Sequence, residues 1–135
     1  MSALKCHCGS ELPFAECCEP FLTGAAIPKT AEVLMRSRYS AYASLNIPYL
    51  KTTLWPKNQQ TFDTAAVSEW ARTSHWTGLK ILETEKGQET DRDGTVLFEA
   101  RYLSAGTLNT HRELSRFRKK SGRWFYVEAL DLPSN

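Results

Sequence analysis

Four thiols that could bind a metal lie together near the start of the chain. The sequence of 135 residues contains four cysteines with the spacing C-x-C-x8-C-C: Cys6, Cys8, Cys17 and Cys18. Structural zinc prefers four nitrogen or sulfur ligands in a tetrahedron, and cysteine thiolate is among its best ligands. The segment therefore predicts a structural zinc site in which four protein thiolates leave no coordination position open for water.

Other uses of these thiols fit the spacing less well. A disulfide between the adjacent Cys17 and Cys18 would close a strained ring, and a reducing compartment disfavours disulfides. A redox-active dithiol usually has the C-x-x-C spacing, which the chain lacks. His7 lies between two predicted ligands, and we expect it at the rim of the site. We also expect a short helix, starting at Ser10 or Pro13, to carry the second pair of cysteines.

The residues Cys6-His7-Cys8-Gly9-Ser10, followed by Cys17-Cys18, resemble the SEC-C motif, the zinc-binding tail of the bacterial preprotein translocase motor SecA. The resemblance implies a small zinc knuckle used for protein contact, which in SecA engages the SecB chaperone and the ribosome. Glu11 and Glu16 stand where typical motifs carry glycine and lysines, so the ligands match but the basic character does not. We expect residues 1–24 to form the knuckle and to bind a protein partner, with the ribosome, a chaperone or the export machinery as candidates.

A second group of reactive side chains lies on a predicted strand. His111, Glu113 and Ser115 alternate along it and therefore share one face. An imidazole that titrates near neutrality, beside a carboxylate whose pKa burial can raise, would suit general acid–base catalysis. A simple hydrogen-bonded pair is the structural alternative, and Arg38 from an earlier helix could neutralise Glu113 in a buried ion pair. The candidate catalytic or ligand-binding residues are therefore Arg38, His111 and Glu113.

The opposite face of the same strand is basic. Arg112, Arg116 and Arg118 would form it, and they could contact RNA or an acidic partner, although a solvated face is the commoner role of such residues. The formal charge of the chain is +2, and four thiolates with one zinc ion would reduce it to zero. Because non-specific nucleic-acid affinity depends on cationic charge, this balance argues against a nucleic-acid-binding protein.

Helices are expected before strands. Helices are predicted from Thr30 to about Asn46, from Tyr49 to Trp55, and after an N-cap at Asp63. Strands are predicted over residues 77–86, 95–104, 107–119 and 123–130, with hairpin turns at Gly94, Gly106 and Gly122. This order predicts an α+β fold in which the helices pack on one face of an antiparallel meander.

The segment Leu34-Met35-Arg36-Ser37-Arg38-Tyr39-Ser40-Ala41-Tyr42, the alternating His111–Phe117 pattern and Gly122-x-Trp124-x-Tyr126 resemble the YchJ family of bacterial SEC-C proteins. The resemblance implies a nuclear transport factor two-like (NTF2-like), or cystatin-like, cone with a pocket, over residues 29–132. Many relatives carry a second cysteine motif at the C-terminus. The chain reaches Asn135 without one, so we do not expect a function that needs two knuckles.

Composition restricts the cellular setting. No stretch approaches the ~20 apolar residues of a membrane span, and Met1-Ser2-Ala3-Leu4-Lys5 lacks the apolar run of a secretory signal. We therefore expect a zinc-binding cytoplasmic protein that acts as a protein-interaction module. The alternative is an enzyme or small-molecule binder that uses the pocket, with acid–base chemistry at His111 and Glu113.

Overall fold

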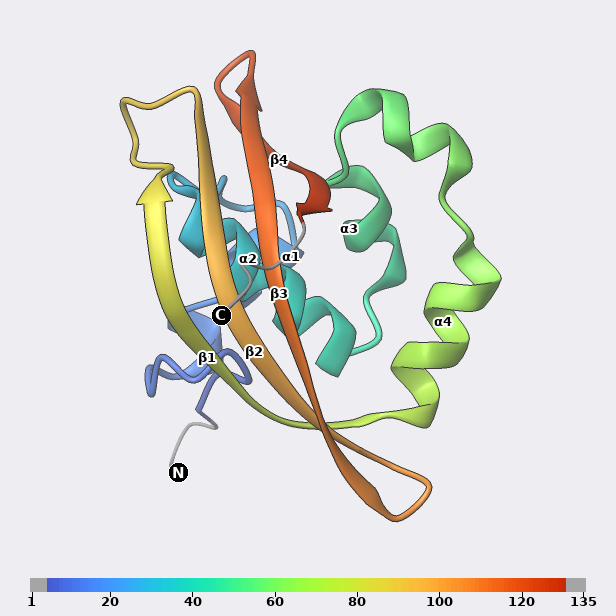
Figure 1. Cartoon of the computed structure of the whole chain (residues 1–135). Coiled ribbons are helices and arrows are strands. Elements are labelled where there is room, and N and C mark those ends of the chain that lie inside the picture. The colour runs from blue at the N-terminus through green and yellow to red at the C-terminus, as the bar shows by residue number, and fades with distance from the viewer. Residues whose placement is uncertain (1–4, 131–135) are drawn as a thin grey trace, which may run out of the picture.

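The computed structural model describes residues 5–130, in which helices precede strands. The α-helices are α1 (Glu19–Leu22), α2 (Ala31–Ala43), α3 (Ile47–Thr52) and α4 (Thr64–Thr73), and 3-10 helices span Phe14–Glu16 and Pro56–Thr61. The strands are β1 (His75–Lys86), β2 (Asp93–Ser104), β3 (Thr107–Lys120) and β4 (Arg123–Leu130). The helices lie on one side of a curved sheet (Figure 1), which confirms the predicted α+β class.

Side-chain caps set the starts of the two longest helices. The Thr30 hydroxyl accepts a hydrogen bond from the amide of Val33 at 3.1 Å, and the Asp63 carboxylate accepts one from Ala66 at 2.9 Å. Both residues were the predicted N-caps, and each satisfies an amide that the first helical turn leaves free.

The helix ends differ from the prediction. Helix α2 ends at Ala43, because Leu45 adopts a φ of 61° and the amide of Asn46 turns back to the carbonyl of Ala41 at 2.8 Å. Helix α3 starts before Tyr49 and ends at Thr52, short of Trp55. The earlier start is possible because Pro48 lies in the first turn of the helix, where the missing amide of a proline costs no intrahelical bond.

The four strands pair in the order β1-β2-β3-β4, each antiparallel to its neighbour, as the predicted meander requires. Gly106 and Gly122 occupy hairpin turns with φ near +80°, as expected. Gly94 does not lie in a turn. It belongs to β2, and a Cβ there would lie 2.4 Å from Gly87, so this glycine permits two backbones to approach closely.

The register of the central strands builds the floor of the cone. Val96, Phe98 and Ala100 of β2 are buried, and they pair with Ser115, Glu113 and His111 of β3 in that order. Helix α2 covers this floor with Leu34, Met35 and Tyr39, which belong to the same core cluster. Polar residues at alternate positions of β3 are therefore held among apolar ones.

The outer edge of β4 is covered by the chain between α3 and α4. The amide of Trp55 donates to the carbonyl of Tyr126 at 2.8 Å, and the amide of Tyr126 donates to Thr53 at 2.8 Å. The side-chain amide of Asn58 donates a further bond to the carbonyl of Val127 at 2.8 Å. These bonds bring Leu54 beside Tyr126 and close one side of the cone.

The helices do not include a membrane span: in residues 5–130, none has the length and hydropathy required to cross a bilayer. The division into a knuckle over residues 1–24 and a cone over 29–132 stays a prediction. Its outer ends, residues 1–4 and 131–132, lie outside the described residues, as does the C-terminal segment 131–135 that lacks a second cysteine motif.

Candidate metal centre and cone cavity

The four cysteine sulfurs form one compact cluster, with all Sγ atoms within 4.8 Å of one another. The Sγ of Cys17 is 3.6 Å from that of Cys8 and 3.9 Å from that of Cys18. Sulfurs arranged tetrahedrally about an ion at the Zn–S distance of about 2.3 Å would be about 3.8 Å apart. The spacing therefore fits a tetrahedral thiolate site, and all four cysteines are free thiols rather than disulfides.

A small hairpin and a helix start present these sulfurs. The amide of Cys6 bonds to the carbonyl of Leu12 at 2.8 Å, and Gly9 turns the chain with a φ of 82°. The second pair lies between two helical segments, because the 3-10 helix ends at Glu16 and α1 starts after Cys18. The expectation of one helix through both cysteines is therefore wrong.

Helix α2 contacts the knuckle directly. The Ser40 hydroxyl lies 3.4 Å from the Cys6 sulfur, and Arg36 donates from Nη1 to the carbonyl of Cys8 at 2.8 Å. Cys6, Cys8 and Cys18 are at most 5% exposed and belong to the core cluster that includes residues of α2. The knuckle is thus packed on the cone.

Hydrogen bonding within the cluster favours thiolate at one position. The bond from Cys18 lowers the pKa of Cys8 to about 4, and the same bond raises the pKa of Cys18. Thiolate is the form that binds metals. His7 lies outside the sulfur cluster and packs edge-on against Phe14, with 5.7 Å between ring centroids.

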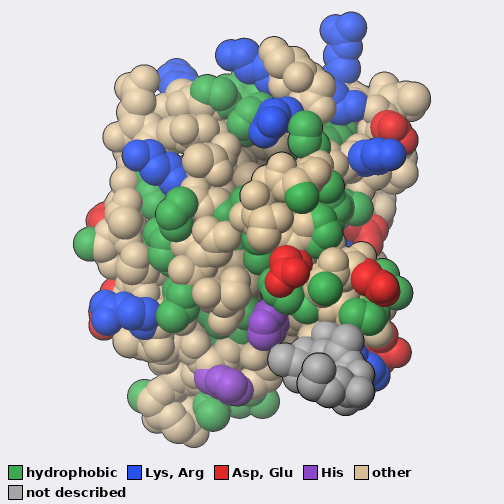
Figure 2. Space-filling view, turned by 180° about the vertical axis from the view of Figure 1, so that it is seen from behind, with side chains coloured by type: hydrophobic (Ala, Val, Ile, Leu, Met, Phe, Trp, Pro, Cys, Tyr) green, Lys and Arg blue, Asp and Glu red, His purple; other side chains and the backbone are tan. Residues whose placement is uncertain are grey.

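The outer surface of the knuckle is apolar and acidic. Leu12 is 52% exposed, and Glu11, Glu16 and Glu19 of the same segment are also exposed. Lys5, which bridges to Pro13 beside Leu12, adds one exposed cation. Acidic side chains are visible on the part of the helix-bearing side where the knuckle lies (Figure 2). The surface of this knuckle is therefore more acidic than the lysine-bearing surface of typical SEC-C motifs.

The cone encloses a cavity of about 250 Å³. Aromatic residues from two helices and three strands form much of its wall, among them Tyr42, Trp70, Trp76, Phe98 and Tyr126. The three candidate residues predicted from the sequence, Arg38, His111 and Glu113, all line this cavity. A guanidinium, an imidazole and a carboxylate therefore share one aromatic-walled space.

Glu113 accepts three hydrogen bonds. Nε2 of His111 lies 3.0 Å from Oε1, the Tyr126 hydroxyl donates to Oε2 at 2.7 Å, and the Ser115 hydroxyl also donates to Oε2. Burial alone would raise the pKa of Glu113, but these three donors together lower it. The direction is opposite to the expected one, so Glu113 is an ionised carboxylate rather than a proton donor.

His111 stands at the mouth of the cavity with 40% of its side chain exposed. The hydrogen bond to Glu113 raises its pKa, against the opposing effect of burial. Because the carboxylate holds the proton on Nε2, Nδ1 is available as an acceptor, and no partner for it is found among residues 5–130. An imidazole oriented in this way could serve as a general base or bind a ligand hydroxyl.

Arg38 does not form the suggested ion pair with Glu113. Nη1 instead donates to the carbonyl of Leu50 at 2.9 Å and to the Thr53 hydroxyl at 2.6 Å. Tyr126 lies between the two charges, with its ring 4.7 Å from the Arg38 guanidinium carbon and its hydroxyl on Glu113. Tyr126 was not among the predicted site residues.

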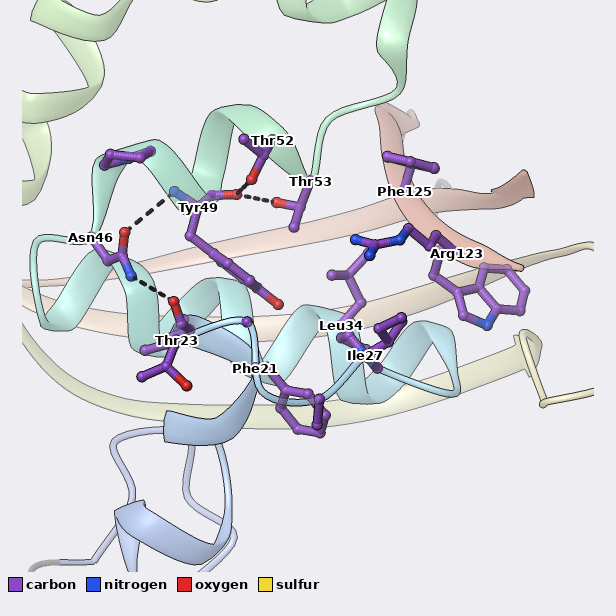
Figure 3. A pocket seen from close by; sticks show the side chains of 16 residues that line it. Phe21, Thr23, Ile27, Leu34, Asn46, Tyr49, Thr52, Thr53, Arg123 and Phe125 are labelled. Carbon is purple, nitrogen blue, oxygen red and sulfur yellow. Dashed lines mark hydrogen bonds between the residues drawn. The ribbon is translucent and has the colours of Figure 1, made fainter. Parts of the chain in front are cut away.

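A second cavity of about 320 Å³ lies between the 23–28 linker, α3 and the start of β4 (Figure 3). Phe21, Ile27 and Leu34 supply apolar walls. Asn46 in its wall serves the backbone: its side chain accepts from the amide of Tyr49 at 3.3 Å and donates to the carbonyl of Leu22 at 3.4 Å. This cavity holds no group of reactive side chains comparable with that of the cone.

The basic residues of β3 have local partners. Arg116 pairs with Glu128 through Nε at 2.8 Å and Nη2 at 2.6 Å, and Arg118 stacks over Trp55 at 4.8 Å. Arg112 pairs in register with Glu99 of β2. The predicted basic face is therefore interleaved with acidic residues.

Comparison with known proteins places this arrangement in context. Residues 30–129 match the family described as the middle NTF2-like domain of YchJ. A UPF0225 protein of Geobacter sulfurreducens is 46% identical over 127 residues, covering 94% of this chain and 79% of that protein. A UPF0225 protein of Haemophilus influenzae is 38% identical over 135 residues, covering 99% of this chain and 83% of that protein.

Two solved structures are similar over both parts of the chain. A SEC-C motif containing protein from Rhodopseudomonas palustris matches with a TM-score of 0.88 and 34% identity, covering 96% of this chain and 100% of that one. One from Psychrobacter arcticus matches with a TM-score of 0.82 and 27% identity, covering 97% of this chain and 84% of that one. The similarity therefore extends over the cysteine cluster and the cone together.

Proposed function

This chain belongs to the YchJ (UPF0225) family, and we propose that it is a zinc-binding protein whose knuckle is structural and docks a protein partner. The observation that supports zinc is the spacing of four sulfurs within 4.8 Å, which suits a closed tetrahedral site. A structural role follows because all four ligands would come from the protein and three of them are buried. A cytoplasmic location agrees with this proposal, since thiolate ligands need a reducing compartment.

Metal analysis tests the zinc proposal. The purified protein should contain about one zinc ion per chain, and Cys17→Ser should lower that content. His7→Ala is the matched control, because His7 lies in the same loop but outside the sulfur cluster. Absence of zinc from the wild type, or equal loss in both variants, would contradict the proposed ligand set.

The proposed docking surface is the outer side of the knuckle, where Leu12 is exposed together with Glu11, Glu16 and Glu19, against the single cation Lys5. An apolar anchor within an acidic rim suits a partner that presents a basic surface with an apolar pocket. The ribosome, a chaperone and the export machinery are the partner classes that the SEC-C motif suggests.

Affinity capture with two matched leucine variants tests docking. Leu12→Ser should lose the partners captured by the wild type, whereas Leu108→Ser should keep them, because Leu108 is 62% exposed but lies outside the knuckle. The partners should also be released as salt rises, since the rim contributes charge. Equal capture by both variants would place docking elsewhere.

The cone supports a second candidate function, the binding of a small molecule with or without acid–base chemistry. The observation in its favour is that Arg38, His111 and Glu113 line one cavity of about 250 Å³. Native mass spectrometry of the purified protein should detect a bound small molecule. Ala100→Leu should exclude it, because Ala100 is 4% exposed and lines the same cavity. Equal ligand content in the variant would contradict a site in the cone.

A further inference from the structure

Arg38 is a buried cation with an incomplete set of partners. It is 5% exposed and lines the cone cavity. Nη1 makes both of its hydrogen bonds, to Leu50 and Thr53, and both acceptors are uncharged. Across residues 5–130, no carboxylate lies within 4.0 Å of this guanidinium, and Nε and Nη2 have no hydrogen-bond acceptor.

This arrangement is costly for the free protein. A buried charge is normally paired, because its removal from water costs several kcal/mol when nothing compensates. The face of the Tyr126 ring, 4.7 Å from the guanidinium carbon, compensates only in part. Glu113 cannot take over the role without moving, since His111, Ser115 and Tyr126 already hold both of its oxygens.

We infer that the guanidinium of Arg38 binds the carboxylate of a small aromatic acid inside the cone. This inference rests on the small-molecule site proposed above and adds the chemical class of its ligand. A carboxylate matches the planar, forked donors of a guanidinium and would fill the positions that the protein leaves without acceptors.

The cavity sets the size and character of the ligand. An apolar cavity of about 150 Å³ accommodates benzene, and the cone offers about 250 Å³. One six-membered ring with a short acidic side chain therefore fits. Trp70 and Trp76 meet edge to face at 5.2 Å and form an aromatic wall suited to such a ring.

Charge within the cavity favours a monoanion. Arg38 contributes one positive charge, and the ionised Glu113 contributes one negative charge to the same space. A monoanion would neutralise the Arg38 guanidinium, whereas the second charge of a dianion such as phosphate would find no further lysine or arginine among the residues that line the cavity. A carboxylate next to Arg38 is separated from Glu113 by the Tyr126 side chain. His111 at the mouth offers its free ring nitrogen to a ligand hydroxyl.

Titration of the zinc-loaded protein, with the knuckle and the cone together, tests the inference. Phenylacetate, phenylacetamide and inorganic phosphate are added separately to ¹⁵N-labelled protein, and amide and indole shifts are followed by NMR. Phenylacetate should bind about tenfold or more tightly than phenylacetamide, because a hydrogen-bonded charge pair replaces a neutral contact. Its shifts should centre on Trp70, Trp76 and residues 111–113, and phosphate should cause none there.

Variants assign the charge. Arg38→Gln should abolish the preference for the acid, while Arg112→Gln, on the opposite and exposed face of β3, should keep it. If Arg38→Gln does not fold, the affinities of the wild type for phenylacetate and phenylacetamide still show whether the cone prefers a carboxylate. Equal binding of acid and amide in the cone would overturn the carboxylate inference but leave the small-molecule site standing. Shifts from neither probe in the cone would overturn both.

Discussion

Tyr126→Phe tests whether Glu113 is held as an ionised carboxylate. The change removes one hydroxyl that donates to Oε2 at 2.7 Å and keeps the ring that stacks on Arg38. Hydrogen bonds to charged groups contribute about 1.5–3 kcal/mol, against about 0.5–1.5 kcal/mol for neutral pairs. Because the Glu113 side chain is only 15% exposed, we expect a loss of about 2 kcal/mol at neutral pH.

The cost should depend on pH in a defined direction. The pKa of Glu113 is below its ordinary value of 4.5 in the folded protein, so its stabilisation is present above 4.5 and is lost as pH falls through the folded value. The penalty of Tyr126→Phe should therefore shrink to about 1 kcal/mol in acid, where a neutral bond remains. The pKa of His111 is raised above 6.5, so its contribution is complete below 6.5 and is lost as pH rises through the folded value.

Urea unfolding monitored by tryptophan fluorescence, at about pH 6 and at a pH below the folded-state pKa of Glu113, measures these quantities. Tyr102→Phe is the matched control, because this tyrosine packs on Trp76 at 5.2 Å and its hydroxyl has no hydrogen-bond partner in the described part of the chain. The control should cost less than about 0.5 kcal/mol at both pH values. If Tyr126→Phe costs no more than the control, or costs the same at both pH values, Glu113 is not an ionised carboxylate held by three hydrogen-bond donors.

Three further predictions concern the knuckle and the sheet. Removal of the metal by a chelator should lower the melting temperature measured by circular dichroism by about 10 °C or more, since structural zinc contributes folding free energy; an unchanged melting curve would contradict a structural role. Arg36→Gln should speed zinc transfer to a chromophoric chelator about tenfold, because the bond to the Cys8 carbonyl is lost. A transfer rate equal to that of the wild type would show that this bond does not stabilise the metal site. Gly87→Ala should cost about 2–3 kcal/mol in urea unfolding, since its Cβ would lie 2.8 Å from the Ala31 Cβ, while Gly122→Ala, with a similar φ and open space, should cost only about 1 kcal/mol. Equal costs for the two glycines would show that φ alone matters.

Local features of the structure could be predicted from the sequence because their causes are local. The caps at Thr30 and Asp63 depend on amides three residues away, and the turns at Gly106 and Gly122 depend on backbone conformation alone. The alternation of His111 and Glu113 on one face of β3 likewise needs only the geometry of a strand.

Long-range contacts explain what the sequence did not reveal. Tyr126 reaches Glu113 through the pairing of β3 with β4, where the register shifts between Arg116 and Phe117. Such an irregularity follows from tertiary packing and has no signature in the spacing of residues. Ser40 and Cys6 are similarly far apart in the chain, so the packing of the knuckle on α2 could not be foreseen.

Other parts of the chain approach both outer strands of the sheet. The segment around Leu54 lies along β4, and the loop at Gly9 lies so close to β1 that a Cβ there would be 3.0 Å from the Leu79 carbonyl. Uncovered edges of a sheet are templates for strand pairing between molecules. If the loop of the knuckle depends on its metal, metal-free protein exposes β1 and self-associates through it. The small metal centre would then protect the protein against aggregation as well as unfolding.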